Sequence, residues 1–310
     1  MKSQHRSAIY ALTAAGVLWG LSVPLSKLAL GWLSPAWLTV VRFAIAAPVL
    51  AYVGRRGLRD ALQPSIAISG VIGFGAVIIL QNVGIEHTSV SHAAVVVGAV
   101  PLLVALISAG IGEASTSAVT WTGYGLALAG IAMVAGHGGS GATATGDLLV
   151  LASATLSAGF IAIQPRLLAG RDATAVTSVQ FAAGGLIALP IAALTGGMPH
   201  APAGIGPVLA LGALAVAGTI LPFPLFAFGQ ARVPAALAGA FVNLEPVVGV
   251  AVGWWAFGET AAIGQLFGAA AVLAGIVLST LPPTERPERK RLAPIAAPDG
   301  VRPLSNTRWF

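Results

Sequence analysis

The side chains best suited to chemistry lie inside long apolar segments of this sequence. Glu245 is the clearest example, because a helix from about Ala235 to Phe257 would place it roughly 15 Å along the axis. A charge at that depth in hydrocarbon is costly and usually functional. Glu245 could therefore bind a proton or a cationic group of a ligand, and the neighbouring Asn243 could hydrogen-bond to a ligand. A neutral Glu245 that only supports a broken helix explains the pattern equally well.

Two basic residues also fall within apolar segments. Lys27 and Arg42 each lie about one to two helical turns from the end of the segment that is predicted to face outward. Together they could form a positive vestibule for a carboxylate. Long basic side chains near a helix end can also reach the membrane interface, and this anchoring role is the interpretation that the sequence favours.

Several uncharged polar residues and one tryptophan are weaker candidates for ligand contacts. Gln81 and Asn82 lie near the end of one apolar segment, His92 begins another, and Gln164 lies within a third. Such residues more often form hydrogen bonds between helices than with a ligand. Trp19 could stack on a ligand or simply fill space in a helix bundle.

Prolines within the apolar segments should interrupt helical hydrogen bonding and kink the chain. The candidate kinks or hinges are Pro24, Pro101, Pro222 and Pro246. Static bends are the simpler interpretation, although bends of this kind can act as hinges.

The composition indicates a membrane protein. Hydrophobic residues make up 56% of the 310 residues and charged residues only 8%, whereas soluble domains are about a quarter charged. The absence of cysteine excludes disulfides and thiol nucleophiles. The net charge of +6 could suggest a nucleic-acid partner, but the basic residues lie in short clusters between apolar segments, so none is expected.

Ten apolar segments are long enough to cross a bilayer as helices, which need about 20 residues each. We therefore expect an all-α integral membrane protein. The predicted spans are Ile9–Leu30, Ala36–Val53, Ser65–Ile85, Ser91–Ile111, Val119–Ala135, Leu148–Leu168, Thr174–Leu194, Val208–Gly229, Ala235–Phe257 and Ala262–Leu281. The segment 282–310 is rich in proline and charge and is expected to be a disordered cytoplasmic tail.

The basic residues also predict the orientation. With the N-terminus in the cytoplasm, every Lys and Arg except Lys27 and Arg42 lies on the cytoplasmic side. This asymmetry follows the positive-inside rule. It predicts a multi-pass protein of the plasma (inner) membrane with both termini in the cytoplasm.

The two halves of the sequence share short motifs in the same order. Thr39–Phe43 and Thr177–Phe181 both read Thr-x-Val-x-Phe. The other matches are Pro101 and Gly112-Glu113 with Pro246 and Gly258-Glu259, and Gly123 and Gly130-Ile131 with Gly268 and Gly275-Ile276. Glu113 and Glu259 follow glycines at helix ends and are interpreted as structural.

The repeat predicts two five-helix units, 9–136 and 147–281, after a cytoplasmic segment 1–8. Because five is an odd number, the second unit would enter the membrane with the opposite orientation. Inverted repeats of this kind are typical of secondary transporters, whose ligand site lies between the halves near the midplane.

The ten-span pattern and its motifs resemble the EamA-type branch of the drug/metabolite transporter superfamily. The matching residues are Trp19-Gly20, Lys27, Arg42-Phe43, Pro101, Gly112-Glu113, Leu244-Glu245-Pro246, Gly258-Glu259, Gln265 and Gly268. The resemblance covers about Ile9 to Leu281. It implies a ten-helix inner-membrane permease, often an exporter of amino acids or other small metabolites.

No enzyme signature accompanies these features. The sequence has no Walker motif, no Gly-x-Ser-x-Gly elbow and no aspartate pair at helical spacing in the apolar segments. We therefore predict a protein that is not an enzyme and that uses neither a cofactor nor a metal.

The function that these observations favour is secondary transport by alternating access, with export of an amino acid or similar small metabolite. Lys27 and Arg42 would meet the carboxylate, Trp19 the apolar part, and Glu245 with Asn243 the floor of the site. The expected partners are the substrate, the lipid bilayer and, as a candidate coupling ion, protons. A broader drug or metabolite permease is one alternative, and a non-transporting membrane sensor or assembly protein is another.

Overall fold

The computed structural model describes residues 2–110, 118–136, 141–230, 232, 241, 244–260 and 262–280. All regular secondary structure in these residues is helical, and they contain no strand. The all-α prediction is therefore confirmed for the described residues. Asn243, Glu113 and the predicted tail 282–310 lie outside them.

The helices of the first half are α1 (Lys2–Gly20), α2 (Ser22–Ala29), α3 (Pro35–Val53), α4 (Leu58–Ala61), α5 (Pro64–Gly70), the π-helical segment η1 (Val71–Ala76), α6 (Val77–Glu86), α7 (Val90–Val97), α8 (Val100–Gly110) and α9 (Ala118–Gly136). Those of the second half are α10 (Ala144–Leu168), α11 (Ala173–Thr195), α12 (Ile205–Ala215), the π-helical segment η2 (Val216–Ile220), α13 (Pro222–Gln230), α15 (Leu244–Ala256) and α16 (Ile263–Thr280).

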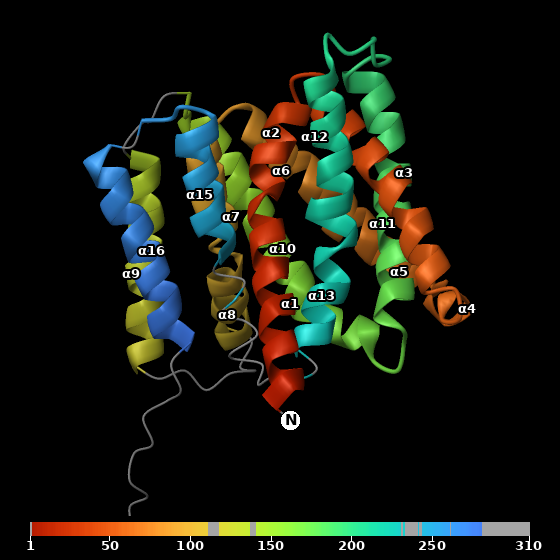
Figure 1. The fold of residues 1–310 in the computed structure, drawn as a ribbon, viewed down its shortest axis with the longest axis horizontal. Coiled ribbons are helices and arrows are strands. Elements are labelled where there is room, and N and C mark those ends of the chain that lie inside the picture. Colours follow the sequence, from red (N-terminus) through yellow and green to blue (C-terminus); the bar gives the residue numbers. More distant parts are fainter. Residues whose placement is uncertain are drawn as a thin grey trace, which may run out of the picture.

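Six helical stretches of the described chain are long and apolar enough to cross a membrane. They are Arg6–Ala29, Pro35–Val53, Pro64–Glu86, Ala144–Gln164, Ala173–Thr195 and Ile205–Phe226. Shorter apolar helices occur at Val90–Val104, Leu244–Ala256 and Ile263–Gly275. The helices form one bundle whose turns lie at its two ends (Figure 1). Ten crossings stay a prediction.

The helices that carry the Thr-x-Val-x-Phe motif pack against each other. Gly54 lies against the backbone of Ala175, and Gly196 lies against Ser34, so α3 and α11 run antiparallel (Figure 1). Between these points, Phe43 stacks on Phe181 with ring centroids 4.7 Å apart. Each phenylalanine is the last residue of its own copy of the motif, so the motif contacts its counterpart.

Helices α9 and α16 show the same reciprocity at one edge of the bundle. A Cβ atom on Gly130 would lie 2.5 Å from the carbonyl oxygen of Gly268, and one on Gly275 would lie 2.5 Å from that of Gly123. Glycine is therefore needed on both sides for these backbones to approach so closely. In the sequence repeat, Gly123 corresponds to Gly268 and Gly130 to Gly275, so the two contacts exchange equivalent residues.

The two π-helical segments also occupy equivalent positions. Residues 71 and 216, where η1 and η2 begin, are separated by the same 145 positions as Pro101 and Pro246. A π-helical turn carries an extra residue and is often found at a functional site. Each segment lies within a longer helical stretch, Pro64–Glu86 or Ile205–Phe226, rather than at its end.

The predicted proline kinks coincide with helix boundaries. Pro24 follows the break at Leu21 between α1 and α2, and Pro222 begins α13 one residue after η2 ends. Pro101 lies in the first turn of α8 and Pro246 in the first turn of α15. Movement at these positions stays a prediction.

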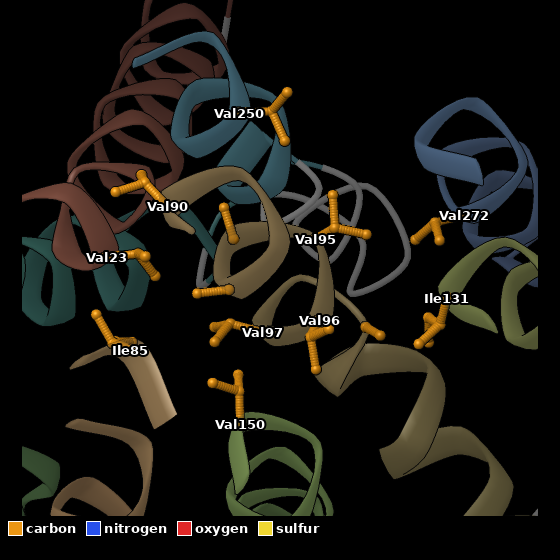
Figure 2. Close-up of a cluster of buried hydrophobic side chains, with 13 residues drawn as sticks. Val23, Ile85, Val90, Val95, Val96, Val97, Ile131, Val150, Val250 and Val272 are labelled. Carbon is orange, nitrogen blue, oxygen red and sulfur yellow. The ribbon is translucent and has the colours of Figure 1, made fainter. Parts of the chain in front are cut away.

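The largest buried cluster is rich in valine and is centred on α7. Val95, Val96 and Val97 of this helix are almost fully buried and lie among Val23, Ile85, Val150, Val250 and Val272 of the surrounding helices (Figure 2). This cluster holds the first half of the chain against the second. It also forms part of the wall of the cavity described next, because Val23, Ile85 and Val97 belong to both.

Candidate functional site

A cavity of about 540 Å³ lies between the two halves of the chain. Its size falls within the range of small-molecule sites, about 300–1,000 Å³. The residues around it come from α1, α2, α3, η1, α6, α7 and α8 of the first half and from α10, α11, η2, α13 and α15 of the second. Five of the residues that the sequence analysis named as candidates line it: Trp19, Arg42, Gln81, Gln164 and Glu245.

Much of the cavity wall is aromatic. Trp19 contacts Phe223 and Phe226, with ring centroids 5.6 and 5.2 Å apart. Phe74 contacts Phe160 and Phe181 at 5.1 and 4.7 Å. These rings give the cavity a large apolar surface, and only a few polar groups lie among them.

Arg42 reaches from α3 across to η2. Its Nε atom donates to Thr219 Oγ1 at 2.7 Å, and its Nη2 atom donates to the carbonyl oxygen of Gly218 at 3.2 Å. The π-helical turn disrupts the regular backbone ladder at this point, which makes a carbonyl available to a side chain. Arg42 therefore points into the bundle, and the interfacial anchoring that the sequence favoured is wrong for this residue.

The charges of Arg42 and Glu245 are not neutralised by other described residues. The ion pairs within the described residues join His87 to Glu86 and His92 to Asp147, so neither cavity charge has an oppositely charged group within 4.0 Å there. An arginine has five N–H donors, and the bonds to Gly218 and Thr219 use two of them.

Glu245 lies in the first turn of α15. The side chain lines the cavity together with Arg42 and Trp19. The same cavity thus presents an acidic group, a basic group and an aromatic surface.

Lys27 has a different environment. It does not line the cavity, and its Nζ atom donates to the carbonyl oxygens of Ile85, Glu86 and Thr88 at 2.7, 2.9 and 2.6 Å. An ammonium group has three N–H donors, so all of them are used where α6 ends. A substrate carboxylate would have to displace these bonds.

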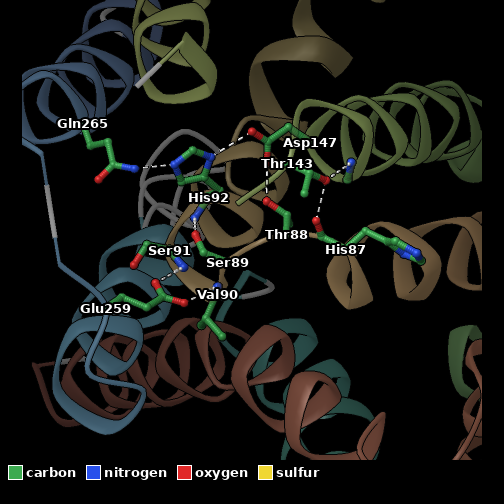
Figure 3. A network of polar contacts seen from close by, with 11 residues as sticks. His87, Thr88, Ser89, Val90, Ser91, His92, Thr143, Asp147, Glu259 and Gln265 are labelled. Carbon is green, nitrogen blue, oxygen red and sulfur yellow. Dashed lines mark hydrogen bonds and ion pairs between the residues drawn. The ribbon is translucent and has the colours of Figure 1, made fainter. Parts of the chain in front are cut away.

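His92 likewise lies outside the cavity, in a buried polar network (Figure 3). Its Nδ1 atom lies 2.8 Å from Asp147 Oδ2, and its Nε2 atom contacts Gln265 Nε2. Thr88 Oγ1 donates to the other oxygen of Asp147 at 2.5 Å. These contacts join α7, α10 and α16 near one end of the bundle, which is a typical role for a buried polar side chain.

Two further polar residues form helix contacts. Glu259 accepts hydrogen bonds from the backbone N–H groups of Val90 and Ser91 at 2.6 and 2.9 Å, at the start of α7 (Figure 3). The structural role predicted for Glu259 is confirmed by these bonds. Asn82 donates to Thr39 Oγ1 at 3.1 Å and so joins α6 to α3.

Some of these residues were not identified from the sequence. Asp147 follows a glycine-rich stretch in the first turn of α10, where an acidic residue is ordinary for a helix start. Thr219 has no motif that distinguishes it from other threonines in apolar segments. Gln180 had one usable signal, since it occupies the position in the second motif that Arg42 occupies in the first.

Comparison with known proteins assigns this architecture to a family. The sequence profile of the EamA-like transporter family matches residues 6–136 and 144–281. A probable terminal-alkyne amino-acid exporter from Streptantibioticus cattleyicolor is 29% identical over 278 residues, which cover 87% of this chain and 92% of that protein. The uncharacterized inner membrane transporter YedA from Escherichia coli (strain K12) is 26% identical over 293 residues, covering 92% and 94%.

A solved crystal structure of a protein has the same fold. It superimposes with a TM-score of 0.66 at 22% sequence identity and covers 89% of this chain and 96% of its own. The apolar helices, the cavity between the halves and the two profile matches agree. The chain belongs to the EamA-like transporter family, and its relatives are membrane transporters of the drug/metabolite transporter superfamily.

Proposed function

We propose that this protein exports an amino acid, or a similar small amphipathic metabolite, across the plasma (inner) membrane. The observation that carries the proposal is the pair of opposite charges in one cavity. Arg42 and Glu245 both line it, and neither has an ionic partner among the described residues. Buried charges are costly unless they are paired. A zwitterion brings both missing partners at once.

The cavity suggests a binding pose. Arg42 would bind the carboxylate and Glu245 the amino group, while Trp19 with Phe223 and Phe226 would contact the apolar part of the substrate. Gln81 lines the same cavity and could add a hydrogen bond. Asn243 stays in the predicted set of substrate contacts. Lys27 and His92 were also predicted contacts, but they bond to other parts of the bundle and are given structural roles in this proposal.

Alternating access would follow from an inverted repeat with units 9–136 and 147–281. The contact of Phe43 with Phe181 and the exchanged contacts of α9 and α16 support two similar units related by a twofold axis. Because the paired helices run antiparallel, that axis would lie in the membrane plane, as in other transporters of this type. Ten crossings and cytoplasmic termini complete the proposal.

One relative supports the substrate class. The protein from Streptantibioticus cattleyicolor is named a probable exporter of a terminal-alkyne amino acid. Such a molecule combines a zwitterionic group with an apolar chain. The charge pair and aromatic wall of the present cavity suit that combination.

Flux into proteoliposomes tests the proposal. Purified protein should carry radiolabelled neutral L-amino acids, and a proton gradient should change the rate if Glu245 binds the coupling proton. Glu245→Gln should abolish that response to the gradient, whereas Asp60→Asn on the exposed α4 helix should preserve it. Flux of hydrophobic drugs but no amino acid would indicate the broader permease, and no flux of either class would favour a non-transporting protein.

A further inference from the structure

Gln164 presents a polar group to the cavity from a mostly apolar stretch of α10. It lines the same cavity as Arg42 and Glu245, and its neighbours Phe160 and Ile161 on α10 also line the cavity. Its side chain forms a reciprocal amide pair with Gln180 of α11. Gln164 Nε2 donates to Gln180 Oε1 at 3.1 Å, and Gln180 Nε2 donates to Gln164 Oε1 at 3.0 Å.

The orientation of this pair is fixed by a third residue. Gln180 is fully buried, and its Nε2 atom also donates to Ser69 Oγ at 3.0 Å. Ser69 Oγ in turn donates its single proton to the carbonyl oxygen of Ile66 at 2.7 Å, so it must accept from Gln180. Both N–H groups of Gln180 are thereby used, and the amide of Gln164 has one possible orientation.

This accounting leaves a defined capacity on Gln164. An amide group has two N–H donors and an oxygen with two lone pairs. The pair with Gln180 uses one donor and one lone pair, and among the described residues one of each stays without a partner on the residue that lines the cavity. A ligand group that satisfies both would be favoured over an apolar group, which would leave them desolvated.

Gln180, which binds Gln164, and Thr219, which binds Arg42, lie at similar distances from one end of the bundle. Counted from the same end of the bundle, Thr219 is roughly 21 Å from the start of α12 and Gln180 roughly 22 Å from the end of α11, at 1.5 Å per residue. The guanidinium of Arg42 binds Thr219, and the amide of Gln164 binds Gln180. Because Arg42 and Gln164 also line the same cavity, one small molecule could contact both.

We propose that Gln164 is a specificity-determining contact that favours substrates whose side chain carries an uncharged donor–acceptor group, such as a hydroxyl or a carboxamide. Gln180 and Ser69 are positioning residues that hold its amide in place. The inference rests on the proposed function, because it assumes that the cavity binds the transported molecule. Arg42 and Glu245 would recognise the charged groups of the substrate, and Gln164 would select among such substrates by the polarity of their side chains.

Matched substrate pairs test this inference. The probes are L-tyrosine with L-phenylalanine and L-glutamine with L-methionine, each measured as proteoliposome flux for wild type and Gln164→Leu. The ratio of polar to apolar flux should fall about tenfold in the variant. Gln180→Leu should lower the same ratio by a smaller factor, because Gln164 stays but is no longer held.

Two further variants keep the test decisive. The double variant Gln164→Leu/Gln180→Leu removes both amides, so neither is left buried without its partner. It should show the same fall in the ratio of polar to apolar flux, and it replaces Gln164→Leu if that variant folds poorly. Gln63→Leu is the matched control, since Gln63 contacts Arg171 away from the cavity and its ratio should equal wild type.

The flux measurements distinguish a failure of the role of Gln164 from a failure of the proposed function. Retained flux with an unchanged ratio in Gln164→Leu or the double variant would overturn the role of Gln164 alone. Absence of amino-acid flux in wild type would contradict the proposed function and this inference together.

Discussion

Phe43 stacks on Phe181 across the interface between the two halves of the chain, with ring centroids 4.7 Å apart and ring planes inclined by 22°. The two residues are counterparts in the sequence repeat. A residue can meet its own counterpart only where an axis of twofold symmetry, here an approximate one, passes between them. Because α3 and α11 run antiparallel, this contact supports two units with opposite orientation in the membrane.

Topology labelling tests that orientation. The chain has no cysteine, so single cysteines can be introduced at the exposed turn residues Arg56 and His200. In whole cells, an impermeant maleimide should label His200→Cys, whereas Arg56→Cys should react only after the membrane is permeabilised. Labelling of both positions from the same side would contradict the predicted arrangement.

Close backbone contact between α9 and α16 gives a prediction for stability. Gly130→Leu would force a side chain into a site where a Cβ atom already lies 2.5 Å from a carbonyl oxygen. Overpacking of this kind typically costs about 1–3 kcal/mol, so the melting temperature in detergent should fall. Gly125→Leu is the matched control, since a Cβ atom there meets nothing within 4 Å. Equal melting temperatures for the two variants would argue against the packing.

Lys27 provides a test that separates a structural role from substrate binding. Lys27→Met removes three hydrogen bonds to carbonyl oxygens where α6 ends. Lost hydrogen bonds to a charged group cost about 1.5–3 kcal/mol each, and less where water can replace them, so thermal stability should drop. The KM for amino acids should stay near that of wild type. A raised KM with unchanged stability would instead support the vestibule predicted from the sequence.

Much of the fold could be predicted from the sequence because a membrane imposes simple rules. Backbone groups in lipid must be bonded within a helix, so long apolar segments identify the helices and prolines mark their breaks. The repeat was visible because glycines such as Gly130 and Gly275 are required by close packing. The choice of five helices for each unit still depends on the charge pattern of the loops.

The candidate site was predicted less completely, for a physical reason. Depth along a helix can be counted, and this singled out Glu245, which lines the cavity; Trp19 and Gln81 were only weaker candidates. The direction in which a long side chain points cannot be predicted from its position along the helix. Arg42 and Lys27 lie at similar distances from their helix ends, yet Arg42 turns inward to Thr219 while Lys27 bonds to the end of α6. Only the positions of η2 and α6 decide between these outcomes.

In the proposed function, Arg42 binds the carboxylate of a zwitterionic substrate in the cavity between the halves. The most direct measurement compares proteoliposome flux of L-phenylalanine with that of L-phenylalaninamide, which lacks the carboxylate, for wild type, Arg42→Gln and the exposed control Arg59→Gln. Wild type and Arg59→Gln should prefer the acid, and Arg42→Gln should lose about tenfold or more of that preference, as expected when a charged hydrogen-bond partner is removed. An unchanged preference for the acid in Arg42→Gln, with flux retained, would contradict the account.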